Sequence, residues 1–305
     1  MKLSVIICTH NPRRDYLERT LTALRGQTLP KESWELLVVD NASAPPLAGA
    51  LDLAWQPAAR IVTESELGIL PARVRGIQES QAELILFVDD DNLLAPDYLA
   101  RAVEIADSHP FLGCWGGSII PEFDTPPPSW IGDFRPLLAC VEVTEDRWSN
   151  LKFVYATVPP TAGMCLRRSV GLEFVRVVKT DPRRQLLGRR GNVGLTNGED
   201  TDLALTACDL GLGTGQFARL KMTHLIAGGR LNEKYLLRLA EGTRLSGLIV
   251  EALRGQRPSP YPSSPLRIAL GKLRRRLFWN RCRRQLFEAD VRARQRACEI
   301  VASWQ

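Results

Sequence analysis

The chain has 305 residues, of which 45% are hydrophobic and 24% are charged, so it can bury a large core as one elaborated domain or two smaller ones. Its seven cysteines show no CxxC spacing, which argues against a disulfide framework. The first residues form a strand-like run instead of a signal peptide, and no apolar run is long enough to cross a bilayer. We therefore expect a globular protein of the reducing cytoplasm.

The net charge of +6 is unevenly distributed. Eleven Lys or Arg and two acidic residues between positions 266 and 296 give that segment +9, which leaves −3 for the rest of the chain. The basic character therefore belongs to a C-terminal tail. The Arg-rich tail by itself suggests a nucleic-acid-binding protein, but a mildly acidic body argues against that alternative, and we expect no nucleic-acid partner.

The first third of the chain alternates segments that are typical of strands and helices. The expected strands are 3–8, 34–39, 60–63 and 84–88. The expected helices are 14–25, 70–79 and 97–108. This order indicates an α/β fold with a mostly parallel, Rossmann-like sheet, right-handed crossovers and helices on both faces.

The composition changes near position 121. Long irregular stretches at 121–160 and 180–197 are predicted to be lids, binding loops or poorly ordered segments. A strand is expected at 220–223, and helices are expected from Glu199 and over 233–253. A linker rich in Pro and Ser then leads to the tail. We divide the chain into two halves of one domain and a helical extension, at 1–120, 121–253 and 254–305.

Three of the expected strands end in polar residues: Cys8–Asn11, Asp40–Ser43 and Asp89–Asp91. The carboxyl ends of parallel strands share one edge of a sheet, where ligands bind. Asp89 and Asp91 can converge because alternate side chains point to opposite faces of a strand, and two such carboxylates suit Mg²⁺ or Mn²⁺ bridging the phosphates of a nucleotide. The alternative to a binding site at Asp89–Asp91 is a solvated acidic turn. The alternative at Asp40 is a helix cap or an Asx turn.

These segments resemble family 2 glycosyltransferases with the GT-A fold, from position 3 to about 253. The matching motifs, in the order of the family, are the opening strand through Asn11, the strand ending at Asp40, Gly68–Gly76, the DxD motif Asp89–Asp91 and the ED pair Glu199–Asp200. The resemblance implies a metal-dependent, inverting transferase of glycan or polysaccharide synthesis. It would move a sugar from a nucleotide diphosphate, expected to be UDP, to an acceptor hydroxyl.

The resemblance also implies roles for individual residues. The donor nucleotide sugar would contact Thr9, His10, Asn11, Asp40, Gly68, Arg73, Asp89 and Asp90. The cofactor, Mn²⁺ or Mg²⁺, would be held by Asp91 and His224 with Asp89, and the acceptor would contact Gly163 and Met164. Independently of the resemblance, the aromatic ring of Trp130 is expected to stack on a face of the acceptor sugar. The alternatives are a structural histidine at 224, an ordinary core strand at 162–168 and an aromatic side chain at 130 that packs a loop against the body.

Transfer to an alcohol needs a base, because an alcohol is a weak nucleophile and must lose its proton as the donor bond breaks. We assign this role to Asp200, with Glu199 beside it orienting the acceptor or the helix. The alternative is that both carboxylates only balance the dipole of the helix that they begin. A nucleotidyltransferase acting on sugar phosphates is the rival enzyme, but it would need a glycine-rich loop after the first strand, and residues 9–14 contain no glycine.

The basic tail carries an apolar stripe at helical spacing, formed by Leu266, Leu270, Leu273, Leu277, Phe278, Cys282 and Leu286. Such a basic amphipathic helix can lie on an anionic membrane surface. Alternatively, it covers apolar surface of the body. We expect a glycan or lipid-linked acceptor and a peripheral position at the inner face of the membrane.

Overall fold

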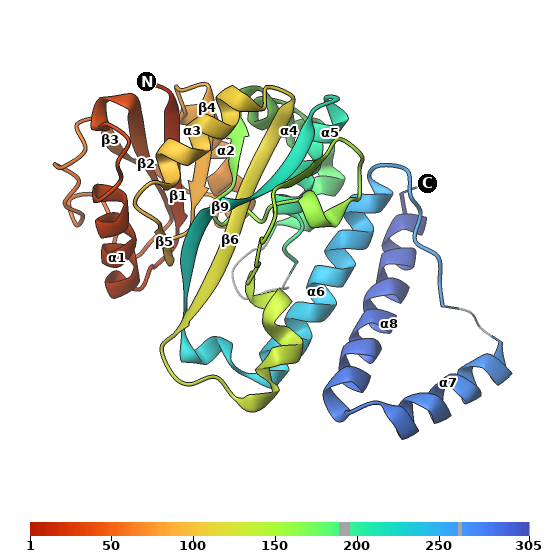
Figure 1. Ribbon diagram of the computed structural model, residues 1–305. Coiled ribbons are helices and arrows are strands. Elements are labelled where there is room, and N and C mark those ends of the chain that lie inside the picture. The colour runs from red at the N-terminus through yellow and green to blue at the C-terminus, as the bar shows by residue number, and fades with distance from the viewer. Residues whose placement is uncertain (189–195, 262–263, 305) are drawn as a thin grey trace.

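The computed structural model describes residues 1–188, 196–261 and 264–304 (Figure 1). Within them the strands are β1 Leu3–Thr9, β2 Trp34–Asn41, β3 Ala59–Glu64, β4 Leu84–Val88, β5 Asn92–Leu94, β6 Leu112–Phe123, β7 Arg147–Ser149, β8 Cys165–Arg167 and β9 Gly213–Ile226. The α-helices are α1 Arg14–Arg25, α2 Ile69–Glu79, α3 Tyr98–Ser108, α4 Arg168–Thr180, α5 Glu199–Asp209, α6 Glu233–Ala252, α7 Pro265–Phe278 and α8 Arg281–Ala302.

The described strands form one nine-stranded sheet in the order β3-β2-β1-β4-β8-β6-β9-β5, with β7 paired to β9. Strand β1 runs parallel to β2 and β4, whereas β8 runs antiparallel to β4 and β6. The register of β1 and β2 sets Thr9 opposite Asp40. The carboxyl ends of β1, β2 and β4 therefore lie at the same edge, as expected for a mostly parallel sheet.

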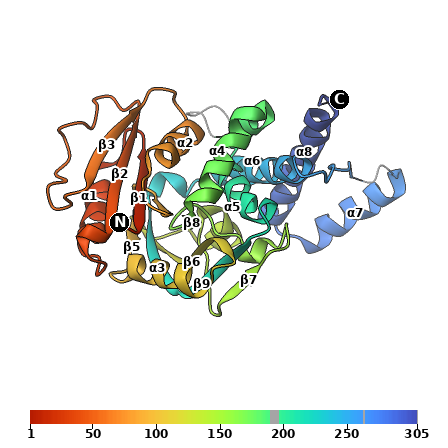
Figure 2. The same cartoon turned by 90° about the horizontal axis from the view of Figure 1, so that it is seen from above.

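Helices cover both faces of the sheet, which explains the continuous apolar runs of its central strands. On one face Leu17 of α1 and Leu99 of α3 pack against the sheet. On the other face Ile77 of α2, Phe174 of α4 and Leu203 of α5 form a second core (Figure 2). The expected α/β fold is confirmed.

The element bounds agree with the sequence prediction where the apolar pattern is strong. The helix at 14–25 and the strand at 84–88 have the predicted bounds, whereas the strand predicted at 220–223 lies within the longer β9. Backbone hydrogen bonds to β6 make β9 longer than the segment that its amino-acid pattern predicts as a strand. Strand β6 also crosses position 120 and so joins both halves of the domain in a single sheet.

The C-terminal tail forms two helices with different surroundings. Helix α8 packs against α6, and Ala289, Ala293 and Ala297 on α8 are fully buried. Helix α7 stands away from the body (Figure 1). Leu266 and Leu273 belong to the predicted stripe, but their side chains are outside the described part of the structure. No helix in the described part of the chain is both long and apolar enough to cross a bilayer.

Candidate functional site

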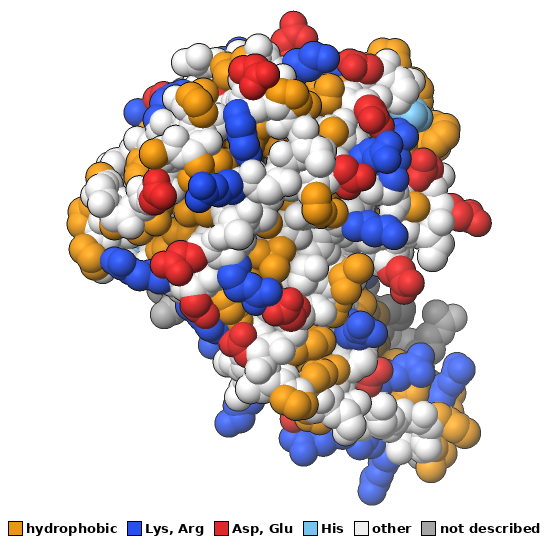
Figure 3. Space-filling view, turned by 60° about the vertical axis from the view of Figure 1, so that its left-hand side comes forward, with side chains coloured by type: hydrophobic (Ala, Val, Ile, Leu, Met, Phe, Trp, Pro, Cys, Tyr) orange, Lys and Arg blue, Asp and Glu red, His pale blue; other side chains and the backbone are white. Residues whose placement is uncertain are grey.

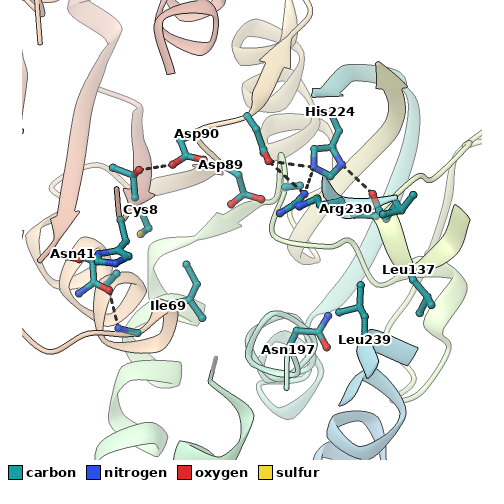
Figure 4. A pocket seen from close by; sticks show the side chains of 18 of the residues that line it. Cys8, Asn41, Ile69, Asp89, Asp90, Leu137, Asn197, His224, Arg230 and Leu239 are labelled. Carbon is teal, nitrogen blue, oxygen red and sulfur yellow. Dashed lines mark hydrogen bonds and ion pairs between the residues drawn. The ribbon is translucent and has the colours of Figure 1, made fainter. Parts of the chain in front are cut away.

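A cavity of about 620 Å³ opens at the carboxyl ends of β1, β2 and β4 (Figure 4). The strand ends and the turn after β4 line one side. The other side is formed by Leu138 at the end of the 3₁₀ helix Ser129–Leu138, by His224 of β9, and by Arg230 and Tyr235. A concave site with a few convergent polar groups at this edge of an α/β sheet is where a small ligand binds.

Asp89, Asp90 and Asp91 form a turn between β4 and β5, which we call the acidic turn. Asn92 shapes it: its Oδ1 accepts from the Asp89 amide at 3.1 Å and its Nδ2 donates to Asp91 Oδ1 at 3.1 Å. Asp90 turns toward β1 and accepts a hydrogen bond from Thr9 Oγ1, whereas Asp89 points into the cavity (Figure 4). The acidic turn therefore does not continue strand β4. Its three side chains point in different directions because each has different hydrogen-bond partners.

Burial raises the pKa of Asp90 to about 6 and also raises the pKa of Asp89, whose second largest influence is the opposing charge of Arg73. Asp91 behaves differently. Burial would raise its pKa as well, but the neighbouring His224 and Arg230 hold that pKa below its usual range. Asp91 is thus the member of the turn that keeps its negative charge most readily.

Asp91 and His224 meet because β5 pairs antiparallel with β9, with Asn92 opposite His224. Asp91 Oδ2 lies 3.4 Å from His224 Nε2. The His224 Nδ1 lies 3.0 Å from the carbonyl oxygen of Leu138, which can only accept, so Nδ1 carries a proton and Nε2 is the ring nitrogen beside Asp91. The predicted pair is brought together by the fold.

This donor set fits a divalent ion that takes its remaining ligands from a bound nucleotide and water. One carboxylate oxygen and one imidazole lone pair converge on the cavity. No group of three or more His, Cys, Asp and Glu side chains within the described ranges could hold a metal ion by itself. Asp89 therefore does not complete a three-residue cage with the other two.

The predicted nucleoside contacts divide into two groups. Thr9 and His10 line the cavity, and His10 Nδ1 lies 2.7 Å from the Asn41 carbonyl oxygen. Asn11 and Asp40 do not line it. Both oxygens of the buried Asp40 accept backbone amides of its own loop, at 3.1 and 2.8 Å, and Asn11 braces the same loop.

Asn41 lines the cavity, although we did not predict it as a site residue. Its Oδ1 accepts from the Gly68 amide at 2.8 Å, and its Nδ2 donates to the Glu66 carbonyl at 2.7 Å. Gly68 has φ +147°, a conformation that favours glycine, and it begins α2 at the cavity wall. The position of Asn41 directly after Asp40 is the signal in the sequence that could have found it.

Arg73 is buried between the acidic turn and α5. Its Nη1 donates to Glu199 Oε1 at 2.6 Å and its Nη2 donates to Thr161 Oγ1 at 2.5 Å, whereas Asp89 Oδ1 is 4.0 Å away. Arg73 does not line the cavity. We predicted Arg73 as a contact of the donor. The structure instead places it as the cation between the acidic turn and the carboxylates that begin α5.

Glu199 and Asp200 begin α5, as predicted. Glu199 is buried, burial raises its pKa to about 7, and its Oε2 has no hydrogen-bond partner among the described residues. Asp200 is half-buried, and burial raises its pKa too, with Arg73 opposing the shift. Asp200 Oδ1 accepts from the Thr201 amide at 2.6 Å, which leaves Oδ2 as the oxygen that can take a proton.

Asp202 fixes the position of α5, a role that we did not predict. It is fully buried and is paired with Arg184 and with Arg254, the latter at 2.6 Å. These two arginines belong to the 3₁₀ helix Pro182–Leu187 and to the segment after α6, so one carboxylate ties three elements together.

Neither Glu199 nor Asp200 lines the cavity, whereas Asn197, which precedes them in the chain, does line it.

The predicted acceptor contacts lie elsewhere. Gly163 has φ +75°, and a Cβ there would lie 2.6 Å from the Tyr98 hydroxyl oxygen, so packing against α3 explains this glycine. Met164 is fully buried in the core and offers no surface to an acceptor, which corrects that prediction. Trp130 packs edge-on against Phe134 at 5.6 Å and lines a separate cavity of about 490 Å³.

The fold and the site can now be compared with known proteins. The structure is similar to Staphylococcus aureus TarS residues 1–349 in complex with UDP, with a TM-score of 0.52, 16% identity and coverage of 100% of this chain and 92% of that one. The complex of the same protein with UDP-GlcNAc gives a TM-score of 0.53 at 15% identity, covering 100% and 93%. The molecule therefore has the GT-A fold.

A family model described as glycosyl transferase family 2 matches residues 4–159. The chain belongs to this family. Glycosyltransferase AglE of Haloferax volcanii is 31% identical over 104 residues, which are 33% of this chain and 34% of that protein. Poly(ribitol-phosphate) beta-N-acetylglucosaminyltransferase TarS of S. aureus is 29% identical over 112 residues, 36% and 19% of the two chains. The matched segment spans about a third or less of these two relatives.

Proposed function

We propose that this protein is a metal-dependent, inverting glycosyltransferase that moves a sugar from a nucleotide diphosphate, with UDP as the nucleotide, to a hydroxyl of a glycan or a lipid-linked acceptor. The observation that carries the proposal is the convergence of Asp91 and His224 on a cavity at the carboxyl ends of β1, β2 and β4. Family membership and the UDP-bound neighbours of the same fold support it.

We assign each part of the donor to a place in the cavity. Thr9, His10 and Asn41 lie where a nucleoside would bind, beside the first two strand ends. Asp91 and His224 would hold Mn²⁺ or Mg²⁺, which when bound neutralises charge on the diphosphate. Asp89, between these two groups, would contact the ribose or the donor sugar.

Asp200 would supply the base. As the acceptor oxygen attacks C1 of the sugar, its proton passes to Asp200 Oδ2, and the bond from C1 to the diphosphate oxygen breaks with its electron pair leaving on the diphosphate. Attack from the face opposite the leaving group inverts the configuration at C1. Arg73 would hold the α5 carboxylates in place, since it is hydrogen-bonded to Glu199.

Thermal-shift measurements with nucleotide sugars, with and without Mn²⁺, test the donor part of the proposal. A UDP-sugar at about 100 times its Kd should raise the melting temperature by on the order of 5 °C, and EDTA should abolish the rise. NMR of the transfer product then reads the anomeric configuration, which should be β from an α-linked donor. A retained configuration, or equal shifts with EDTA, would contradict the assignment.

We also propose that α7 contacts an anionic membrane surface. Its hydrophobic side chains Leu270, Leu277 and Phe278 are 58%, 66% and 77% exposed, and their spacing places them on one face. Figure 3 shows Lys and Arg side chains beside hydrophobic ones at the lower end of the molecule, where the tail lies. Cys282 and Leu286 of α8 pack against apolar residues of α6, so within the described part of the tail the exposed stripe is that of α7.

Vesicle sedimentation tests this second proposal. The chain should bind vesicles that contain anionic lipid and leave neutral vesicles unbound, and the double change Leu277→Asp and Phe278→Asp should abolish binding. Leu210→Asp, at a comparably exposed leucine of the body, is the matched control. Unchanged binding of the double variant would reject α7 as the contact, and binding of duplex DNA in place of vesicles would favour the nucleic-acid alternative.

A further inference from the structure

Arg230 lies between the two predicted metal ligands. Its Nη1 is 2.9 Å from His224 Nε2 and 3.5 Å from Asp91 Oδ2 (Figure 4). These two ligand atoms are themselves 3.4 Å apart. One guanidinium nitrogen therefore contacts both of the atoms that would bind a divalent ion.

The tautomer of His224 makes this contact exclusive. Nδ1 donates to the Leu138 carbonyl oxygen, and a guanidinium can only donate, so Nε2 accepts the hydrogen bond from Arg230 through its lone pair. A metal ion would need the same lone pair. Arg230 and a metal ion therefore cannot both bind Nε2.

The charges of the cavity explain why a cation occupies this place. Three carboxylates of the acidic turn follow one another along the chain, and each is half-buried at the cavity. Of the described residues that line the cavity, Arg230 alone carries a guanidinium or ammonium group. It offsets the charge of the turn at the site where a divalent ion would otherwise do so.

Arg230 also has room to move. It ends the short 3₁₀ helix Gly228–Arg230 after β9, and its side chain is 39% exposed, compared with 14% for Asp91. A guanidinium released from His224 would remain in the same cavity. There it can form charge-assisted hydrogen bonds with phosphate oxygens, which its planar donor geometry suits.

We propose that Arg230 and the divalent ion are alternative partners of the Asp91–His224 pair. Without metal, the guanidinium holds the two ligands together. Metal binding displaces Arg230, which then faces the diphosphate of the donor. The second half of the proposal rests on the proposed transferase function, whereas the exchange of partners does not.

The proposal predicts opposite effects of one substitution on two ligands. In Arg230→Gln the ion no longer has to displace a competitor, so Mn²⁺ should bind about 10-fold more tightly in the absence of nucleotide. UDP at saturating Mn²⁺ should bind about 10-fold more weakly, because a charge-assisted contact is lost. A residue that only supports the local structure would weaken both affinities.

The experiment measures Mn²⁺ binding to the full chain by electron paramagnetic resonance of the free ion, and UDP binding by calorimetry. Arg238→Gln, on the exposed side of α6, is the matched control and should leave both affinities unchanged. Thermal unfolding of each variant verifies that it is folded. Unchanged or weaker Mn²⁺ binding in Arg230→Gln overturns the proposal, and so does the absence of Mn²⁺ binding to the unsubstituted chain.

The outcomes separate this inference from the proposed function. Tighter Mn²⁺ binding in Arg230→Gln, without transfer of any nucleotide sugar by the unsubstituted chain, would support the exchange and reject the transferase. Metal-dependent transfer with unchanged Mn²⁺ affinity in Arg230→Gln would reject the exchange and leave the transferase in place.

Discussion

The acidic turn and the first turn of α5 both bury carboxylates, but they differ in the cations that surround them. In α5 each fully buried carboxylate has a buried arginine of its own, since Glu199 pairs with Arg73 and Asp202 pairs with Arg254. In the acidic turn the half-exposed Arg230 contacts Asp91, whereas Asp89 lies 4.0 Å from Arg73 and Asp90 accepts a hydrogen bond from Thr9. Charge is thus balanced within the protein at α5, whereas the turn keeps charge available to a ligand.

This difference indicates which region supports the fold and which region serves the reaction. Substitutions in the network of α5 should cost stability, and substitutions in the acidic turn should cost ligand binding and turnover. Asp200 is the exception, because it belongs to α5 but is only half-buried, and the base role is assigned to it.

Asp200→Asn tests that exception and should have the largest effect. Transfer should fall by on the order of 10⁴, because the amide cannot accept the acceptor proton. UDP binding and the melting temperature should stay unchanged. A radiolabelled-sugar transfer assay measures the first, and Asp107→Asn on the exposed side of α3 is the control. Retained turnover would remove Asp200 from the mechanism.

Arg73→Met should lower the free energy of unfolding by about 3–5 kcal/mol, because the buried Glu199 must then either take up a proton or stay charged without a partner. Urea denaturation measures this loss. Adding Glu199→Gln should recover part of it, since the two side chains form one pair and their substitutions are coupled. Strict additivity of the two changes would show that the pair is not a unit and would weaken the contrast with the acidic turn.

Asp91→Asn should show the opposite pattern. Mn²⁺ binding should be lost and transfer should fall by about 10²–10³, as for removal of one preorganised electrostatic contact. Stability without metal should fall much less than in Arg73→Met, since the turn carries excess negative charge. Titration calorimetry with Mn²⁺ measures the first effect. A stability loss equal to that of Arg73→Met would show that the acidic turn is structural.

The pH dependence of stability gives the smallest effect. Burial raises the pKa of Glu199 from 4.5 to about 7, so between these values the folded chain binds more protons than the unfolded chain. The contribution of Glu199 to stability therefore decreases as the pH rises through this range. Glu199→Gln should remove that decrease, whereas Glu18→Gln, at an exposed position of α1, should retain it. Parallel curves for wild type and Glu199→Gln would contradict the shift.

Much of the fold could be predicted from the sequence, because local patterns specify it. Apolar runs such as 84–88 mark strands that are buried on both faces, and the spacing of Leu17, Leu21 and Leu24 marks the buried face of α1. The order of these segments then allows few sheet topologies. Family membership confirms the resemblance that the motifs indicated.

Site residues could be predicted only where the pairing of strands itself brings the functional side chains together. Asp91 and His224 meet as expected, because β5 and β9 pair beside the cavity. Roles that depend on side-chain partners could not be read from motifs. Asp40 uses its oxygens for its own loop, and Met164 faces the core. Both facts depend on neighbours far along the chain, which residue type and spacing do not specify.

The sequence by itself determined the α/β architecture, the edge at which polar strand ends gather and the family, because periodicity and motif order are local properties of the chain. Only the tertiary structure decided which charges are paired. It placed Arg73 beside Glu199, 126 positions away, and Arg230 beside Asp91. The physical reason is that burial makes the energy of a charge depend on its nearest partner, and folding alone determines that partner.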